Sequence, residues 1–187
     1  MTLYRALVLT FVAALAACGS TVERFAVPAP AETAVPRIAS RYRTIEVRQV
    51  SLPTYAASEE IASRGEGGAI TSDKSLLWAD EPARAITLEL ARMLGVMTRA
   101  QVAAEPWPFL DRAAALVDVR VEEMVAAADG TFRLSGQYYV APDSGIGGQS
   151  GLFEISAPIV GEGPVAIAAA RGAAVRDLAE QIARKAL

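Results

Sequence analysis

Residues 117–140, VDVRVEEMVAAADGTFRLSGQYYV, decide the fold. Apolar and polar side chains alternate at the start of this stretch, and the period of two predicts a strand with one buried face. The pair Asp129–Gly130 is typical of a tight turn. Apolar residues with the same period follow the turn, so a second strand should return beside the first. The residues that share the buried face are Val117, Val119, Val121, Phe132, Leu134, Tyr138 and Val140.

A third strand is predicted at residues 152–157, LFEISA, after a glycine-rich loop over residues 142–151. Three sequential strands with short connections form an antiparallel meander. Upstream, residues 43–48 alternate in the same way and predict another strand. Residues 60–71 contain two short apolar segments around a glycine-rich turn, which predicts a hairpin. A phosphate-binding loop is disfavoured because no Gly-Lys-Ser/Thr ending follows the glycines.

A helix is predicted to begin after Asp80, which can act as its N-cap, with Pro82 in the first turn. Gly95 is the expected C-terminal stop. Apolar residues at helical spacing should form the buried stripe, and the charged residues between them should face solvent. The stripe consists of Ala83, Ile86, Leu90, Met93 and Met97, and the outward residues are Arg84, Glu89 and Arg92.

A second long helix is predicted from Gly163 to the C-terminus, and Gly172 within it indicates a close approach by a neighbouring helix or sheet. The predicted fold is a single α+β domain, in which an antiparallel sheet carries two main helices on one face. The expected buried stripe of this helix is Ile167, Ala170, Ala174, Leu178 and Ile182. The expected solvent side is Arg171, Arg176, Asp177, Glu180 and Lys185.

The composition excludes several kinds of chemistry. The 187 residues include no histidine and a single cysteine, so histidine-dependent catalysis, histidine metal sites and an internal disulfide are excluded. The net charge of −3 and the absence of a basic stretch argue against a nucleic-acid partner. Neighbouring carboxylates such as Glu122 and Glu123 point to opposite faces of a strand. We therefore expect no enzyme, no metal and no cofactor.

The single cysteine follows a secretory leader. Residues 1–17 contain one charge, Arg5, and an apolar run too short to span a bilayer. The leader ends in Leu15-Ala16-Ala17-Cys18, which resembles the lipobox of bacterial lipoproteins. This resemblance implies cleavage before Cys18 and a lipid on its sulfur, and multiple acyl chains would give a lasting membrane anchor. Gly19, in place of aspartate, favours sorting to the periplasmic leaflet of the outer membrane, with the inner membrane as the alternative.

The expected organisation has three parts: a signal peptide at 1–17, a lipidated N-terminus with an extended proline-containing tether at 18–41, and a folded domain at 42–187. A short edge strand is expected within the tether, at residues 23–27. Removing the leader would leave 17 basic and 21 acidic groups, a net charge of −4. Lipid chains rather than basic residues should therefore hold the protein at a membrane.

Two short motifs suggest a family. One is the strand end Leu52-Pro53-Thr54-Tyr55, and the other is Leu77-Trp78-Ala79-Asp80-Glu81-Pro82 at the start of a helix. With the lipobox, the meander and the final helix, they make the chain resemble the ABC-type transport auxiliary lipoproteins, the PqiC-like (YmbA-like) family. The resemblance implies a non-enzymatic partner of MCE-domain proteins in lipid transport between the two membranes, with a possible homo-oligomer. Cys18 is its functional residue, and Leu52, Pro53, Tyr55, Trp78 and Pro82 are implied to be structural.

Two alternatives remain open. The first is a carrier of a lipid or small ligand, with a hydrophobic pocket between the helices and the sheet. The second is a hydrolase of the cell envelope, which would need a cleft with two suitably spaced carboxylates. Trp78 could stack on a ligand, although a packing role is the simpler interpretation. The residues expected to line the carrier pocket are Ile86, Leu90, Phe132 and Leu178.

Overall fold

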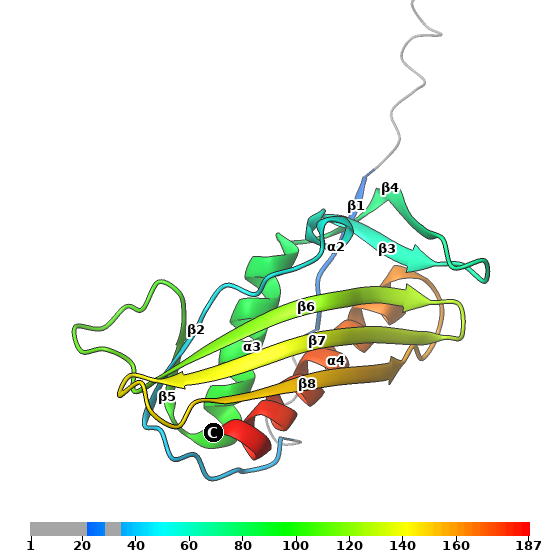
Figure 1. The fold of residues 1–187 in the computed structure, drawn as a ribbon. Coiled ribbons are helices and arrows are strands. Elements are labelled where there is room, and N and C mark those ends of the chain that lie inside the picture. The colour runs from blue at the N-terminus through cyan, green and yellow to red at the C-terminus, as the bar shows by residue number, and fades with distance from the viewer. Residues whose placement is uncertain (1–21, 29–34) are drawn as a thin grey trace, which may run out of the picture.

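A computed structural model describes residues 22–28 and 35–187. The predicted meander is present as three long antiparallel strands: β6 (Ala115–Ala127), β7 (Thr131–Pro142) and β8 (Gln149–Pro158) (Figure 1). All seven residues predicted for its buried face are at most 6% exposed. The alternating pattern thus predicted both the strands and the face that packs on the helices.

Strand β6 contains a β-bulge that the alternating pattern does not reveal. Val121 pairs with Gly136, whereas Glu123 pairs with Ser135, so Glu122 is the additional residue. The bulge shifts the phase of the strand by one position. Odd-numbered residues up to Val121 pack into the main core, and Met124 and Ala126 do so after it.

Five shorter strands complete a mixed sheet. The predicted hairpin forms between β3 (Glu60–Arg64) and β4 (Ile70–Trp78). Strand β2 (Thr44–Val47) lies parallel to β6 on one side and parallel to β5 (Gln101–Ala104) on the other. Strand β1 (Glu23–Phe25) lies at the edge, parallel to β4. The antiparallel prediction therefore holds for the hairpin and the meander, while the other pairings of the described strands are parallel.

Two long helices, α3 (Pro82–Thr98) and α4 (Gly163–Ala186), lie against the same face of the sheet (Figure 1). Helix α4 contacts β7 and β8, α3 contacts β2 and β5, and the helices contact each other. The predicted stripe of α3 is buried, as are the residues of the α4 stripe from Ala170 onward. A single-turn helix, α2 (Thr54–Ala57), connects β2 to β3.

Both ends of α3 differ from the prediction. The N-cap is Glu81 rather than Asp80. At the other end the helix continues past Gly95 to Thr98, because the stop is made by Arg99 in the left-handed conformation, with φ of 60°. The Arg99 amide donates to the Gly95 carbonyl at 3.0 Å, which satisfies a carbonyl at the end of the helix.

The described part of the expected tether packs against the domain. β1 confirms the predicted edge strand, and Val27 lies so close to α4 that a Cβ added at Gly172 would be 2.7 Å from its Cγ1. The close approach predicted at Gly172 is therefore real, but its partner is the N-terminal segment. Farther along, Val35 is buried and the Ile38 amide donates to the Met97 carbonyl at 3.0 Å. Residues 22–28 and 35–41 are thus not a free spacer.

These layers form a single α+β domain, which confirms the predicted fold class. The two helices and the inner face of the sheet enclose one main hydrophobic core. A smaller cluster forms around Ile61, Trp78 and Ala168, where β1 and β4 meet the start of α4. Among the described helices, none is long and apolar enough to cross a membrane.

Candidate functional site

The expected lipidation residue Cys18 and sorting residue Gly19 lie outside the described residues. Strand β1 begins at Glu23, five residues after Cys18. Five residues of fully extended chain span at most roughly 18 Å. A lipid on Cys18 would therefore keep the β1 end of the domain within that distance of the membrane surface.

The residues of the first family motif support the turn between β2 and β3. Pro53 is the N-cap of α2, and its carbonyl accepts the amide hydrogen bonds of the last two residues of that helix. Leu52 packs against the main core. The Tyr55 hydroxyl accepts a hydrogen bond of 3.1 Å from the Met124 amide, just after the bulge in β6. Leu52 and Tyr55 thus contact other parts of the fold, whereas Pro53 caps the short helix.

The residues of the second motif lie where β4 turns into α3. Trp78 is the last residue of β4 and is 3% exposed. Pro82 is the first residue of α3, where a missing N–H leaves no hydrogen bond unmade. The Arg171 guanidinium carbon lies 4.5 Å from the centre of the Trp78 ring, within the range of a cation–π interaction.

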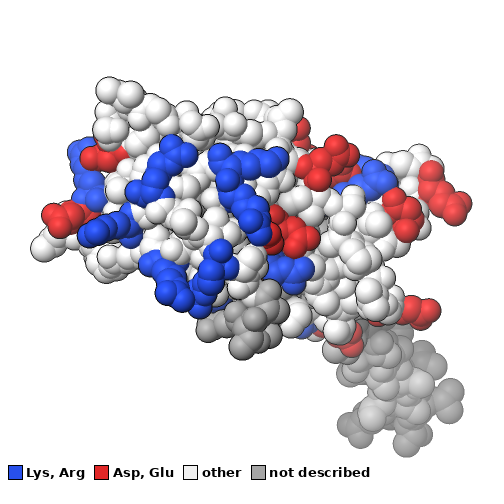
Figure 2. Space-filling model, turned by 90° about the horizontal axis from the view of Figure 1, so that it is seen from below, with Lys and Arg blue, Asp and Glu red and all other residues white. Residues whose placement is uncertain are grey.

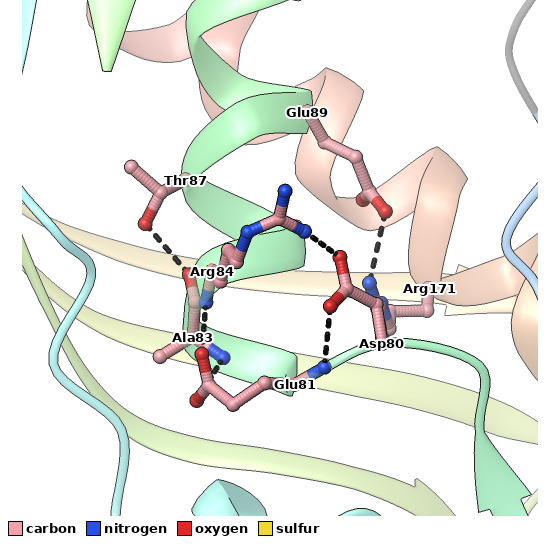
Figure 3. Close-up of polar contacts among 7 residues, drawn as sticks. All are labelled: Asp80, Glu81, Ala83, Arg84, Thr87, Glu89 and Arg171. Carbon is pink, nitrogen blue, oxygen red and sulfur yellow. Dashed lines mark hydrogen bonds and ion pairs between the residues drawn. The ribbon is translucent and has the colours of Figure 1, made fainter. Parts of the chain in front are cut away.

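A network of acidic side chains starts α3 (Figure 3). The Glu81 carboxylate accepts hydrogen bonds from the amides of Ala83 and Arg84, at 3.0 and 2.7 Å. Asp80 does not cap the helix; its carboxylate accepts from the Glu81 amide at 2.9 Å and pairs with the Arg84 guanidinium. Both carboxylates therefore bind donors of the same turn, where a negative charge is favourable to the start of a helix.

Arg171 and Glu89 were both expected on solvent faces, and the structure places them between the two helices. Arg171 is 1% exposed, the most buried charged side chain among the described residues. Its Nη2 lies 2.9 Å from Glu89 Oε1, and the Glu89 side chain is 25% exposed (Figure 3). Burial raises the pKa of Glu89 and lowers the pKa of Arg171, because removal from water opposes both charges.

The pair lines a cavity of about 230 Å³. The N-terminal segment Phe25–Pro28 forms one wall, and residues of α3, α4 and the junction at residues 78–80 form the others. Within this site Glu89 Oε2 and Arg171 Nε are buried without a hydrogen-bond partner. Both atoms are inaccessible to solvent, so a ligand in the cavity would reach them only if these side chains moved. Trp78, Leu88 and Val175 add apolar surface to the lining.

The cavity differs from the pocket expected for a carrier. Ile86, Leu90, Phe132 and Leu178 are at most 1% exposed and belong to the packed core, and none of them lines this cavity. The charged residues that do line it are Asp80, Glu89, Arg92 and Arg171. Within residues 22–28 and 35–187 there is no cluster of three or more carboxylate or thiol groups that could hold a metal ion.

The fold and this site define a small single-domain α+β protein that brings an N-terminal edge strand to a charged cavity between its two long helices. The chain belongs to the family of ABC-type transport auxiliary lipoprotein components, whose model matches residues 25–183. The match begins within β1 and ends in the last turns of α4, so it includes nearly all of the domain. A comparison with curated proteins finds no significant match.

Solved structures share the fold at low sequence identity. A crystal structure of an uncharacterized protein superimposes with a TM-score of 0.69 at 15% identity, covering 86% of this chain and 96% of that chain. A DUF330 protein from Xanthomonas campestris gives a TM-score of 0.60 at 16% identity, covering 88% of this chain and 91% of that chain. At such identities the likeness concerns the fold.

Proposed function

We propose that this chain is a lipid-anchored, non-enzymatic component of an MCE/ABC-type lipid transport system, in which it docks an MCE-domain protein. The observation that carries the proposal is the sequence Leu15-Ala16-Ala17-Cys18 directly ahead of a domain of the auxiliary lipoprotein family. The proposed location is the periplasmic leaflet of the outer membrane, favoured over the inner membrane by Gly19. The anchor fixes the position of the domain, and its surface recognises the partner.

The position of β1 supports this arrangement. β1 is part of the sheet, so a lipid on Cys18 would connect to the domain through only the few residues ahead of Glu23. The domain would then be held close to the membrane in a restricted orientation. A docking component benefits from such a restriction, because less rotational freedom is lost when the partner binds.

Replacing Cys18 with alanine should release the protein from membranes, because two or three acyl chains supply the binding energy and the acidic body supplies none. Fractionation of cells should find the wild type in the membrane pellet and Cys18→Ala in the soluble fraction. Ser20→Ala, which leaves the lipobox intact, is the control. A Cys18→Ala protein that stays with the membrane would contradict the anchor.

The partner is tested by affinity purification of the full chain from native membranes. We expect an MCE-domain protein to co-purify with the wild type and to be depleted with Cys18→Ala, since release from the membrane lowers the effective concentration at the partner. If wild-type preparations repeatedly contain no MCE-domain protein, the docking role is wrong.

A carrier role is the second candidate, and the cavity beside Arg171 favours it. Its apolar lining beside the ion pair of Arg171 and Glu89 suits a small amphiphile with a polar head group. Native mass spectrometry should detect such a ligand on the wild type and lose it with Leu88→Trp, which narrows the cavity. Val165→Trp, at an exposed apolar residue outside the lining, is the matched control. Wild-type protein that is always empty would exclude this role.

A further inference from the structure

Both long helices end at the same end of the molecule, the lower end in Figure 1, and the segment 37–43 crosses their ends. The Ile38 amide donates to the Met97 carbonyl in the last turn of α3. The Arg41 amide donates to the Leu187 carbonyl, directly after α4, at 2.7 Å. Side chains of three segments that are far apart in the sequence therefore meet on one surface.

This surface, which we call the basic end, collects positive charge (Figure 2). All six of its basic residues are exposed. Among the described residues only one of them, Arg184, has an ion-pair partner, Glu180. Counted with Glu180, the basic end carries a charge of +5, and the rest of the chain from Cys18 onward has 11 basic and 20 acidic groups, a net charge of −9. The basic end consists of Arg37, Arg41, Arg43, Arg99, Arg184 and Lys185.

Favourable interaction with the helix dipoles explains only part of this cluster. Arg99, Arg184 and Lys185 lie in or directly after the last turns of α3 and α4, where a positive charge contributes a few tenths to about 1 kcal/mol. Arg41 and Arg43 come from an irregular segment and its junction with β2, and their side chains have no ion pair within the described part of the chain. Unpaired positive charges on one surface are typical of recognition of an acidic partner.

The basic end also lies away from the proposed anchor. β1 runs beside the residues that precede α3, since Phe25 pairs with Trp78, whereas Arg99 follows the last residue of α3. The 17 residues of α3 separate these positions by about 25 Å at 1.5 Å per residue. A domain held by Cys18 at its β1 end therefore presents the basic end away from its own membrane.

We propose that the basic end is the docking surface for an acidic protein surface of the transport partner. This inference rests on the proposed function for the orientation of the domain. Anionic lipid is disfavoured as the target because the anchored membrane lies at the other end. Charge complementarity would then set the register of the complex and speed its formation.

Photo-crosslinking in intact cells tests the inference with the full, lipidated chain. A photoreactive amino acid is introduced at position 41 or 185 in the basic end, and at position 74 or 120 as controls elsewhere on the exposed surface. We expect a protein adduct from positions 41 and 185 only, and peptide mapping should place the linkage in an acidic segment.

The triple variant Arg43→Glu, Arg99→Glu and Arg184→Glu should lower the adduct yield about tenfold or more. Reversing the mapped acidic residues of the partner should restore it.

The outcomes separate the inference from the proposed function. Adducts with an MCE-domain protein from positions 74 or 120 alone would overturn the basic end and leave the function intact. Adducts from the basic end with a different acidic protein would support the surface and overturn the MCE assignment. No protein adduct from the basic end, or adducts with lipid only, would overturn the inference. An unchanged thermal unfolding midpoint of the triple variant would show that the loss of adduct does not come from unfolding. The charge-matched control combines Lys74→Glu, Arg84→Glu and Arg120→Glu, which lie outside the basic end.

Discussion

Replacing Gly136 with alanine is expected to prevent stable folding of the domain. Gly136 has a φ of 155° and pairs with Val121 at the bulge in β6. A Cβ at this position would lie 2.2 Å from the Arg120 carbonyl oxygen and 2.9 Å from the Val121 Cα. Both atoms are backbone of the paired strand, so neither can rotate away. We expect a loss of more than about 4 kcal/mol in the free energy of unfolding.

Urea denaturation of purified protein, together with the yield of folded protein, measures this effect. Gly130→Ala is the matched control, because Gly130 also has a positive φ, 78°, but an added Cβ would meet nothing within 4 Å. It should lose only about 1 kcal/mol, the conformational cost of the left-handed region. If the two variants lose similar stability, the steric account of Gly136 is wrong.

The bulge shows why alternation predicts strands better than it predicts pairing. The seven buried residues of the meander could be identified because each strand keeps its period over several residues. The position of the additional residue, Glu122, depends on the partner strand β7. The backbone of β6 approaches Gly136 of that strand so closely that only glycine fits. One sequence cannot specify which residue of the first strand meets Gly136 in the second.

The parallel pairings were missed for a related reason. Hairpins follow from short connections that are visible in the sequence, and both predicted hairpins are antiparallel. β2 and β5 are joined instead by a long connection that includes α3. A parallel pair requires such a crossover. Which strand pairs with which after a long crossover depends on the packing of the whole domain. The basic end was hidden in the same way, because its residues meet only in the folded chain.

The burial of Arg171 could have been predicted from helical spacing alone. It follows Ile167 by four residues and precedes Ala174 by three, so it belongs to the apolar stripe of α4. Glu89 follows Ile86 by three residues in the same way. The prediction assigned both to solvent because charged residues are seldom fully buried unless they are paired. A pair of opposite charges, each on the apolar stripe of its own helix, is the signal that identifies them.

Replacing Arg171 with methionine is the second change expected to have a large effect. Methionine keeps the unbranched aliphatic part of the side chain but removes the guanidinium, which faces Glu89 and lies beside the Trp78 ring. Breaking a buried ion pair from one side leaves the other charge uncompensated and typically costs about 3–5 kcal/mol. We expect a loss near 3 kcal/mol at pH 7, because the Glu89 side chain keeps some access to water. Arg176→Met, at a partly exposed position of the same helix, is the control and should lose far less.

The pH dependence of this loss identifies its cause. Burial raises the pKa of Glu89 even beside Arg171, and removal of the guanidinium takes away the attraction that lowers it, so the pKa should rise further in the variant. In the unfolded chain this carboxyl loses its proton above about pH 4.3, the ordinary pKa of glutamate. In the folded variant its pKa is higher, so the folded state still binds the proton over a range of pH above that value. The free energy of unfolding then falls as the pH rises through this window. The deficit of Arg171→Met should be smaller at about pH 5 than at pH 7 in urea titrations. The double variant of Arg171→Met and Glu89→Gln is compared with Glu89→Gln alone, so neither protein contains the titrating group, and the deficit between them should not depend on pH. If the deficit of the single variant Arg171→Met is equal at both pH values, lost packing rather than the unpaired carboxylate is responsible.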